Sequence, residues 1–138
     1  MNRTDWWFAR YLEHVAGDAT LPTITKLEVA LHTDTQGIID NENTVTIDIF
    51  PTELSFADYS RKQVAFNAAN GDSTADIKWY QSVDDWNSIA VISIVGTCLF
   101  KTKQYKKSLW WKQLDNPVSK LSTENLFIGK ALLNIRQS

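Results

Sequence analysis

The chain has 138 residues, of which 43% are hydrophobic and 22% are charged, and these are the proportions of one ordinary globular domain. Fourteen Lys and Arg against sixteen Asp and Glu give a net charge of −2, so neither nucleic acid nor an anionic membrane is expected as a partner. The single cysteine, Cys98, excludes an internal disulfide, and no stretch reaches the roughly 18 apolar residues of a membrane-spanning helix. We therefore predict a single domain over residues 1–138, made and kept in a reducing cytosol because no signal-peptide run follows its first residues.

The first predicted element is a short amphipathic helix over residues 4–16. Thr4 can cap its beginning, and Gly17 lies just past its end. Its apolar side chains form one stripe at helical spacing with an aromatic row beside it: Phe8, Leu12 and Val15, then Trp7 and Tyr11. This apolar face is wider than one small core requires, so we expect residues 1–17 to form an element that docks on a partner.

The remainder of the chain, residues 24–136, has the patterning of β-structure. Alternating apolar and polar residues, or short apolar runs, predict strands over residues 24–32, 44–50, 59–66, 75–80, 86–95, 97–101, 107–114 and 130–136. Residues 33–43 are typical of a long loop, and Asn70-Gly71-Asp72 favours a turn with positive φ. A helix followed by seven or eight strands predicts a mainly β domain, an antiparallel β-sandwich with one N-terminal α-helix.

Residue types that carry catalysis or bind metals do not converge in the sequence. His14 and His32 lack the spacing of a metal site and are interpreted as surface histidines. Cys98 lies in an apolar run, which favours a small buried thiol over a nucleophile. Two acidic pairs are interpreted as solvated loop acids: Asp40 with Glu42, and Asp84 with Asp85. We therefore expect a protein that is not an enzyme, with no catalytic residue, no metal and no cofactor.

One segment, residues 101–112, interleaves five lysines with three aromatic side chains. Grooves that bind single-stranded nucleic acid have this composition. Because the chain is net acidic and the segment lacks arginine and glycine, we instead predict an exposed hairpin loop over Lys103–Lys107.

The six tryptophans include two adjacent pairs, Trp6-Trp7 and Trp110-Trp111. Neighbouring strand residues point to opposite faces, so the second pair cannot enter one core. Either the sheet is covered on both faces at this strand, or one indole forms a binding surface. Together the pairs favour a protein-contact role, with Trp6, Trp7, Tyr11, Trp110 and Trp111 as candidate interface residues.

A resemblance to a known protein family indicates where such a contact role would operate. The run Tyr59-Ser-Arg61-Lys-Gln-Val64-Ala-Phe66 resembles the Y-x-R-x-x-V-x-F signature of small bacteriophage tail-fibre or tail-associated virion proteins. Further segments are similar in the same order, so the resemblance covers about residues 27–135: Ala30–Thr33, Asn67–Gly71, Trp86–Ile94, Leu109–Leu114 and Leu126–Leu132. It implies a structural signature made of Tyr59, Arg61, Val64, Phe66 and Trp86.

Within this signature we expect a structural role for Arg61. Its side chain shares a strand face with Tyr59, so it can lie along that ring or bridge to an acid such as Asp58. Loss of the Arg61 side chain would then lower the melting temperature of the domain.

The resemblance implies a non-enzymatic structural protein of the phage virion, in the tail, baseplate or fibre-attachment region. Such a protein would contact other virion proteins, with a homo-oligomer compatible with that role, and would assemble in the host bacterial cytoplasm. Two alternatives stay open. One is a carbohydrate-binding module that reads a host glycan through Trp79, Trp110, Asp84 and Asp85. The other is a capsid-decorating protein, which differs from the first reading in copy number.

Overall fold

The computed structural model describes residues 1–39 and 50–136. Its elements follow the chain in the order β1 (Asn2–Arg3), α1 (Asp5–Val15), β2 (Thr23–His32), β3 (Lys62–Gln63), β4 (Ile77–Trp79), β5 (Trp86–Phe100), β6 (Lys103–Lys120) and β7 (Leu126–Ile128). The strands pair antiparallel in one sheet of order β1-β6-β5-β2-β3 and a second sheet of β4 and β7. The predicted fold class is confirmed: the chain is mainly β with one N-terminal helix, consistent with a β-sandwich.

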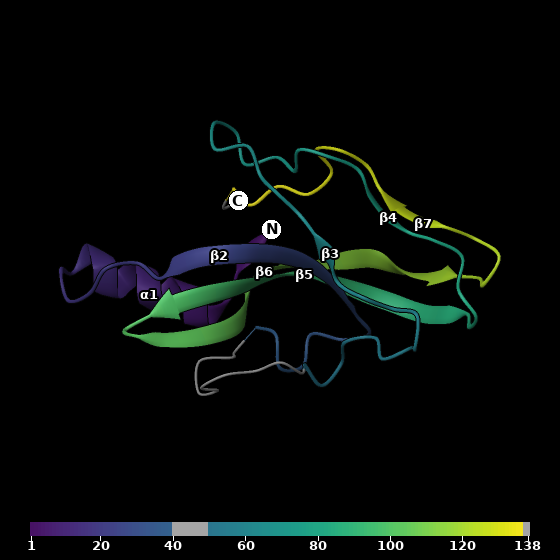
Figure 1. Cartoon of the computed structure of the whole chain (residues 1–138), viewed down its shortest axis with the longest axis horizontal. Coiled ribbons are helices and arrows are strands. Elements are labelled where there is room, and N and C mark those ends of the chain that lie inside the picture. The colour runs from purple at the N-terminus through teal and green to yellow at the C-terminus, as the bar shows by residue number, and fades with distance from the viewer. Residues whose placement is uncertain (40–49, 137–138) are drawn as a thin grey trace.

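The long strands β5 and β6 form the centre of the main sheet. They pair from Trp86↔Lys120 to Phe100↔Lys103, and β2 lies along the other edge of β5. Figure 1 shows β4, β7 and the C-terminal segment lying over one side of this sheet, while the segment that follows β2 lies on the other side. α1 projects at the end of the sheet where β5 turns into β6, far from β7 (Figure 1).

Both faces of the main sheet are covered. The larger core cluster lies on one face and joins the two sheets; it includes Val29, Ile94, Trp110, Ile77 and Ile128. On the opposite face, Ala30 and Val95 pack with Phe50. Alternate residues of β2 and β5 are therefore buried on opposite faces, which explains why β5 carries apolar side chains on both faces.

A bulge in β6 brings Leu109 over Gly96. Ile94 pairs with Trp110 and Val95 pairs with Ser108, so Leu109 is the extra residue on β6. Leu109 is fully buried, and a Cβ atom built on Gly96 would lie 2.5 Å from its Cδ1 atom. A glycine is needed here because the leucine occupies the space of a side chain.

Several predicted element boundaries are confirmed. Gly71 has a φ of +80° within the predicted Asn70-Gly71-Asp72 turn. β4 buries Ile77 and Trp79 on one face, as their alternation predicts. The predicted strand over 44–50 falls, apart from its last residue, on residues 40–49, which lie outside the described residues, as does the end of the predicted 33–43 loop.

Other boundaries were predicted wrongly. Residues 86–95 and 97–101 form one strand up to Phe100, because Gly96 stays paired with Lys107. The hairpin turn consists of Lys101 and Thr102, with φ values of +48° and +67°, so the predicted loop over 103–107 is instead part of β6. These two residues carry no turn signature.

The segments at 59–66 and 130–136 also differ from the prediction. Only Lys62–Gln63 forms a strand in the first, because the chain crosses from the main sheet to a bridge between Phe66 and Ser73. Residues 130–136 form a turn with a single bridge between Asp72 and Asn134, and the last strand is β7.

Candidate functional site

The N-terminal helix is anchored to β6 through its cap, Thr4. The hydroxyl of Thr4 accepts a hydrogen bond from the Trp7 backbone N–H at 3.4 Å and donates one to the Ser108 carbonyl at 2.6 Å. The Thr4 backbone N–H donates to the Leu109 carbonyl at 2.9 Å. At the other end, Gly17 has a φ of +79° and follows the last helical turn. The predicted cap and stop are confirmed, and the cap holds α1 against the sheet.

The inner face of α1 is built around Trp6, which is 1% exposed. Its ring packs on Tyr105 with centroids 5.7 Å apart. The Arg10 guanidinium and the Lys107 ammonium lie over the same ring at 5.3 and 5.6 Å. These contacts bury the aliphatic part of the Lys107 side chain. Lys107 therefore lies in the interior, although the sequence predicted that it belongs to an exposed loop.

The side chains of the Trp110-Trp111 pair are mostly buried in the fold. Trp110 is 7% exposed and meets Trp7 edge-on at 5.8 Å. Trp111 is half-buried next to β1, and its indole N–H is buried with no hydrogen-bond partner in residues 1–39 and 50–136. The structure thus places Trp6 and Trp110 in the core instead of on a contact surface, because both indoles fill the space between α1 and β6.

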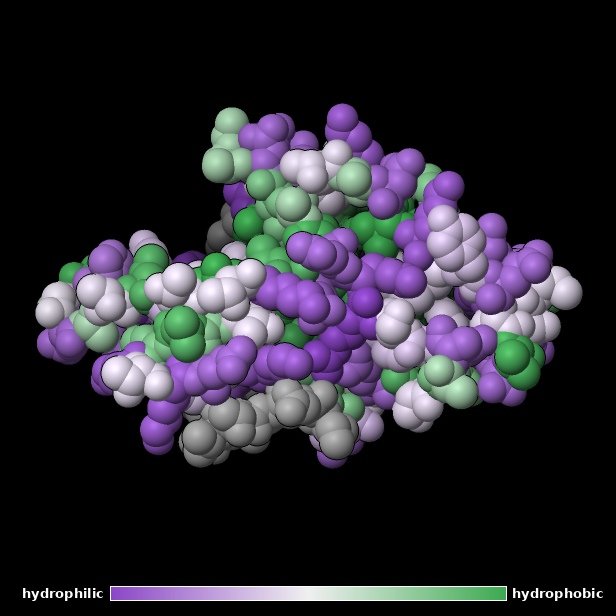
Figure 2. All heavy atoms as spheres, in the orientation of Figure 1, coloured by the Kyte–Doolittle hydropathy of each residue, from purple (hydrophilic) through white to green (hydrophobic). Residues whose placement is uncertain are grey.

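The outer face of α1 is apolar and exposed. Its side chains recur at helical spacing and we call them the α1 patch: Phe8 (42% exposed), Tyr11 (41%), Leu12 (49%) and Val15 (65%). The Arg3 guanidinium lies 4.9 Å from the ring of Phe8 and 5.0 Å from that of Tyr11 and steadies both rings. In Figure 2 a band of hydrophilic residues crosses the middle of the molecule, and at the α1 end on the left hydrophobic residues reach the surface among pale and hydrophilic ones. Of the predicted interface residues, Tyr11 belongs to this patch.

The signature residues form packing contacts. Trp86 is 1% exposed, stacks parallel to Phe56 and meets Tyr59 edge-on, and the Lys120 ammonium lies 4.5 Å from its centroid. Val64 is also in the core. The signature is therefore a set of buried and partly buried residues that pack β5 and β6 against the segment over residues 56–66.

Arg61 pairs with Glu53 and not with Asp58. Its guanidinium donates two hydrogen bonds to the Glu53 carboxylate, at 2.8 and 2.9 Å, and the Tyr59 hydroxyl donates a third at 2.7 Å. These bonds raise the pKa of Arg61, and burial together with Glu53 raises the pKa of Tyr59. Asp58 instead accepts from the Val83 backbone N–H. The sequence could not identify Glu53 because nothing local marks it as the partner.

His32 is buried, although the sequence indicated a surface histidine. Its Nε2 lies 2.6 Å from the Ser93 hydroxyl, its Nδ1 is buried with no hydrogen-bond partner among the described residues, and its ring meets Phe50 edge-on. Burial lowers the pKa of His32 to about 4, so the ring is neutral at neutral pH. A serine bonded to a histidine is also the geometry of an activated nucleophile. Here both residues are 0% exposed, so a substrate has no access to the pair as it stands.

Cys98 is also enclosed. It is 0% exposed within the main core cluster, and burial raises the pKa of its thiol to about 12. The thiol is therefore protonated at neutral pH and behaves as a small apolar side chain.

The residues predicted for a sugar site are not brought together. Trp79 is 1% exposed and donates its indole N–H to the Ser60 carbonyl at 2.7 Å. Asp84 and Asp85 lie in the turn before β5, where Asp85 accepts from the Ser122 backbone N–H. Trp110 lines a shallow recess of about 590 Å³ near Phe66 and the turn at residues 67–71. Neither Trp79 nor Trp110 offers an open ring face to a sugar.

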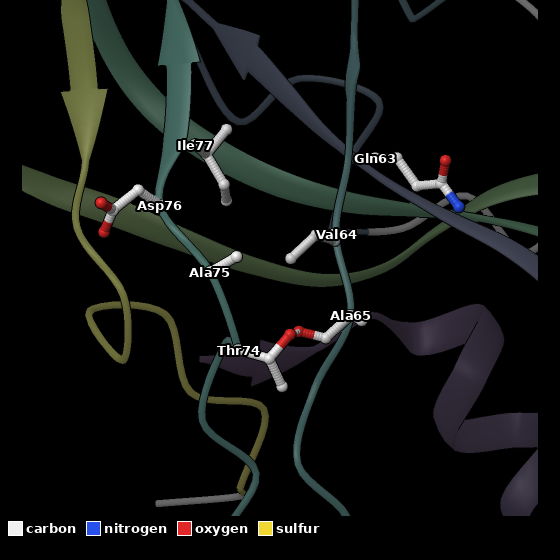
Figure 3. A pocket seen from close by; sticks show the side chains of 7 residues that line it. All are labelled: Gln63, Val64, Ala65, Thr74, Ala75, Asp76 and Ile77. Carbon is white, nitrogen blue, oxygen red and sulfur yellow. Dashed lines mark hydrogen bonds between the residues drawn. The ribbon is translucent and has the colours of Figure 1, made fainter.

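Two further recesses lie around the second sheet. One of about 300 Å³ separates residues 63–65 from residues 74–77; Figure 3 shows Val64, Ala75 and Ile77 pointing into it and Asp76 pointing away. Thr74 closes it by bonding to the Ala65 carbonyl. The other is an apolar groove of about 320 Å³ between β6 and β7, lined by residues that include Leu114, Val118, Leu126, Phe127 and Leu132. We call it the β6–β7 groove.

Within residues 1–39 and 50–136, no group of three or more His, Cys, Asp or Glu side chains could hold a metal ion. In the same residues, the structure contains no helix with the length and hydrophobicity that crossing a membrane requires. Comparisons of the chain with protein-family models, curated proteins and solved structures find no match. Among the described features, the α1 patch is the strongest candidate for a functional surface.

Proposed function

We propose that this protein is a non-enzymatic structural component of a bacteriophage virion, in the tail, baseplate or fibre-attachment region, and that it works through protein–protein contacts. The observation that carries the contact role is the α1 patch, four exposed apolar side chains on one face of an anchored helix. The phage setting is supported by the sequence signature at residues 59–66.

The α1 patch has the composition and rigidity of a contact surface. Phe8 and Tyr11 are aromatic, and aromatic side chains at the centre of an interface carry much of its binding energy. Thr4 and Trp6 fix the helix before any partner arrives, so little conformational entropy is lost on binding. A partner with an apolar groove would bury the patch as an amphipathic helix is buried in other complexes.

The first test is quantitative mass spectrometry of purified particles of the source phage. A few to a few dozen copies per particle, relative to the major capsid protein, support a tail or baseplate position. Hundreds of copies support the capsid-decorating alternative. Absence of the chain from particles overturns the proposal.

The second test asks whether the α1 patch carries the contact. When the phage carries the Leu12→Glu substitution in this chain, particles should contain less than about one-tenth of the normal amount of the chain. The reason is that a charge buried in the contact opposes apolar docking. His14→Glu is the matched control, since His14 is exposed on the same helix outside the patch. Both chains must keep the same circular dichroism spectrum and melting temperature. Equal incorporation of the two variants overturns the role of the patch.

One observation favours the glycan-binding alternative. The recess at Trp110 is also lined by Asn67, Asn70 and Arg136, which are polar residues of the kind that orient a sugar. The Asn67 and Asn70 side-chain oxygens already accept bonds from backbone N–H groups of the same turn. Glycan-array binding that is lost in a folded Arg136→Ala chain would support this alternative, and an array without binding would remove it.

A further inference from the structure

The smaller sheet covers only part of the main sheet. The main sheet has the strand order β1-β6-β5-β2-β3, whereas the smaller sheet consists of β4 and β7. β4 lies towards β3, because the recess beside β4 is bounded by residues 63–65. Figure 3 shows the strand that carries Ile77 between that segment and the yellow β7. β7 therefore lies on the β6 side, and within residues 1–39 and 50–136 the smaller sheet has no strand beyond it.

The β6–β7 groove lies in the place that a third strand of the smaller sheet would occupy. Its floor consists of buried side chains from β2 and β5 that are at most 7% exposed, namely Leu31, Ile89 and Ile92. Its rim is open to solvent, since Val118 on β6 is 40% exposed and Leu132 is 66% exposed. The apolar face of the main sheet is therefore only partly covered here.

β7 also presents backbone groups to the groove. In the part of the chain that the structure describes, the backbone of residues 126–128 pairs with β4 alone. The N–H and C=O groups of alternate strand residues point to opposite edges, so β7 has such groups on the edge that faces away from β4. All three residues line the groove. An occupant with a free backbone would therefore gain hydrogen bonds as well as apolar contact.

The space beside β7 suits a single extended segment and not the edge of another folded sheet. β6 lies under the groove and, among the described residues, β1 is its only strand neighbour on the outer side, at Trp110 and Trp111. A second copy that paired through its own β7 would bring its own β6 under the same space, where the two main sheets would collide. An extended segment brings no sheet beneath it.

The lining of the groove specifies the side chains of this segment. All lining residues apart from Lys112 are apolar, so the side chains that point inwards, at alternate positions, must be apolar as well. Lys112 is exposed and makes no ion pair within the described residues. A second lysine, Lys78, lies with its ammonium 5.5 Å from the centroid of the Phe127 ring. Since no acidic residue among those described lines the groove, an acidic side chain on the segment would complement these cations.

We propose that the β6–β7 groove binds an extended segment of another protein chain, which adds beside β7 as the third strand of the smaller sheet. The segment carries apolar side chains at alternate positions and an acidic side chain near Lys112. Backbone hydrogen bonds to β7 supply affinity, and the groove selects the side chains. This surface is separate from the α1 patch, which lies at the other end of the sheet (Figure 1), and it does not depend on the phage setting.

The experiment titrates the full-length chain, labelled for NMR, with a synthetic eight-residue peptide at up to about 2 mM, which detects a Kd near that value. The six central residues of the peptide alternate valine with threonine. Both ends are glutamate, so an acid reaches Lys112 in either strand direction. We expect chemical-shift changes at the amides of residues 126–128 and at the methyl groups of Leu114 and Val118. A peptide that shifts none of these signals overturns the proposal.

Backbone methylation separates strand addition from apolar binding alone. One peptide is methylated on its valine nitrogens and another on its threonine nitrogens. Because alternate N–H groups point to opposite edges, one of the two, and only one, should lose binding. Binding by both peptides or by neither overturns strand addition. Decanoate is titrated in parallel: if it shifts the groove methyl groups and the unmethylated peptide does not, the groove is a site for acyl chains and the proposal fails.

Two neighbouring substitutions locate the binding site. Val118→Glu places a charge in the groove and should weaken peptide binding by more than about tenfold. Ser119→Glu is the matched control, because Ser119 is exposed on β6 but does not line the groove, and its affinity should stay within about twofold of the unaltered chain. Both chains must keep the same melting temperature, and Leu132→Glu takes the place of Val118→Glu if that chain does not fold. Equal affinities of the groove variant and the control contradict the proposal.

The α1 patch provides a control for independence. Leu12→Glu should leave peptide binding unchanged, so this inference and the proposed function are tested by different variants. If Leu12→Glu abolishes incorporation into particles while no peptide binds the groove, the added strand is overturned and the contact role of the patch stands. If the peptide binds as expected while Leu12→Glu enters particles normally, the groove stands and the role of the patch is overturned.

Discussion

Replacing Arg61 by alanine tests the buried network at the signature. In the folded chain, the Glu53 and Arg61 side chains are only 11% and 14% exposed and share two hydrogen bonds. Breaking a buried ion pair leaves an uncompensated charge and costs about 3–5 kcal/mol. The remaining exposure of Glu53 and its bond from Tyr59 reduce this, so we expect about 3 kcal/mol of lost unfolding free energy. For a domain of this length, that loss lowers the melting temperature by about 10 °C.

The assay is thermal and urea unfolding followed by circular dichroism. A second substitution identifies the cause: Glu53→Gln in the Arg61→Ala chain removes the orphaned charge and should recover about half of the loss. Arg61→Lys keeps the charge without the paired bonds and should fall between the two chains. A melting temperature unchanged by Arg61→Ala would refute the reasoning and would indicate that the arginine serves a partner instead of the fold.

Three other buried positions give further predictions. Burial lowers the pKa of His32 to about 4, so between that value and about pH 6.5 the unfolded chain binds more protons than the folded chain. From pH 7 to pH 5, this group should therefore lower the unfolding free energy by about 2 kcal/mol. The His32→Gln chain should lack this change in urea titrations. Gly96→Ala should lower the unfolding free energy by about 1–2 kcal/mol in the unaltered chain and by much less in a Leu109→Ala chain. An equal loss in both chains would contradict a clash between the added Cβ and Leu109. Cys98 should resist a thiol reagent until the chain is denatured, and rapid labelling of the native chain would show that β5 opens.

Features set by neighbouring residues could be predicted from the sequence. The helix begins at Thr4 and stops before Gly17 because capping and positive φ depend on residues within a few positions. β5 was marked by its apolar character on both faces, since β-sheet burial has a period of two. The fold class followed from such local patterns.

Features set by distant residues could not be predicted. His32 is buried because Ser93, 61 positions away, bonds to it, and Lys107 is buried because the Trp6 ring covers it. The hairpin turn escaped detection because Lys101 and Thr102 are not turn residues, and the pairing of β5 with β6 imposes their conformation.

The same limit applied to the candidate site. An amphipathic helix has two sides, and its sequence marked an apolar surface without indicating which side would face the sheet. The aromatic Trp6 turned inwards to Tyr105, and the predicted stripe of Phe8, Leu12 and Val15 stayed outside. The groove between β6 and β7 had no sequence signal, because its walls come from segments that only the fold brings together.

The anchoring of α1 has a consequence for the order of folding. Thr4 bonds to Ser108 across 104 positions, whereas β5 and β6 meet through a two-residue turn. Contacts between distant residues form slowly because they close large loops, so we expect the β5–β6 hairpin to form early and the helix to dock late. During synthesis, the ribosome would then have to add residues well beyond 108 before the helix could dock on the sheet. Only a molecule that has finished folding would present that helix correctly, so premature association of incomplete chains is disfavoured.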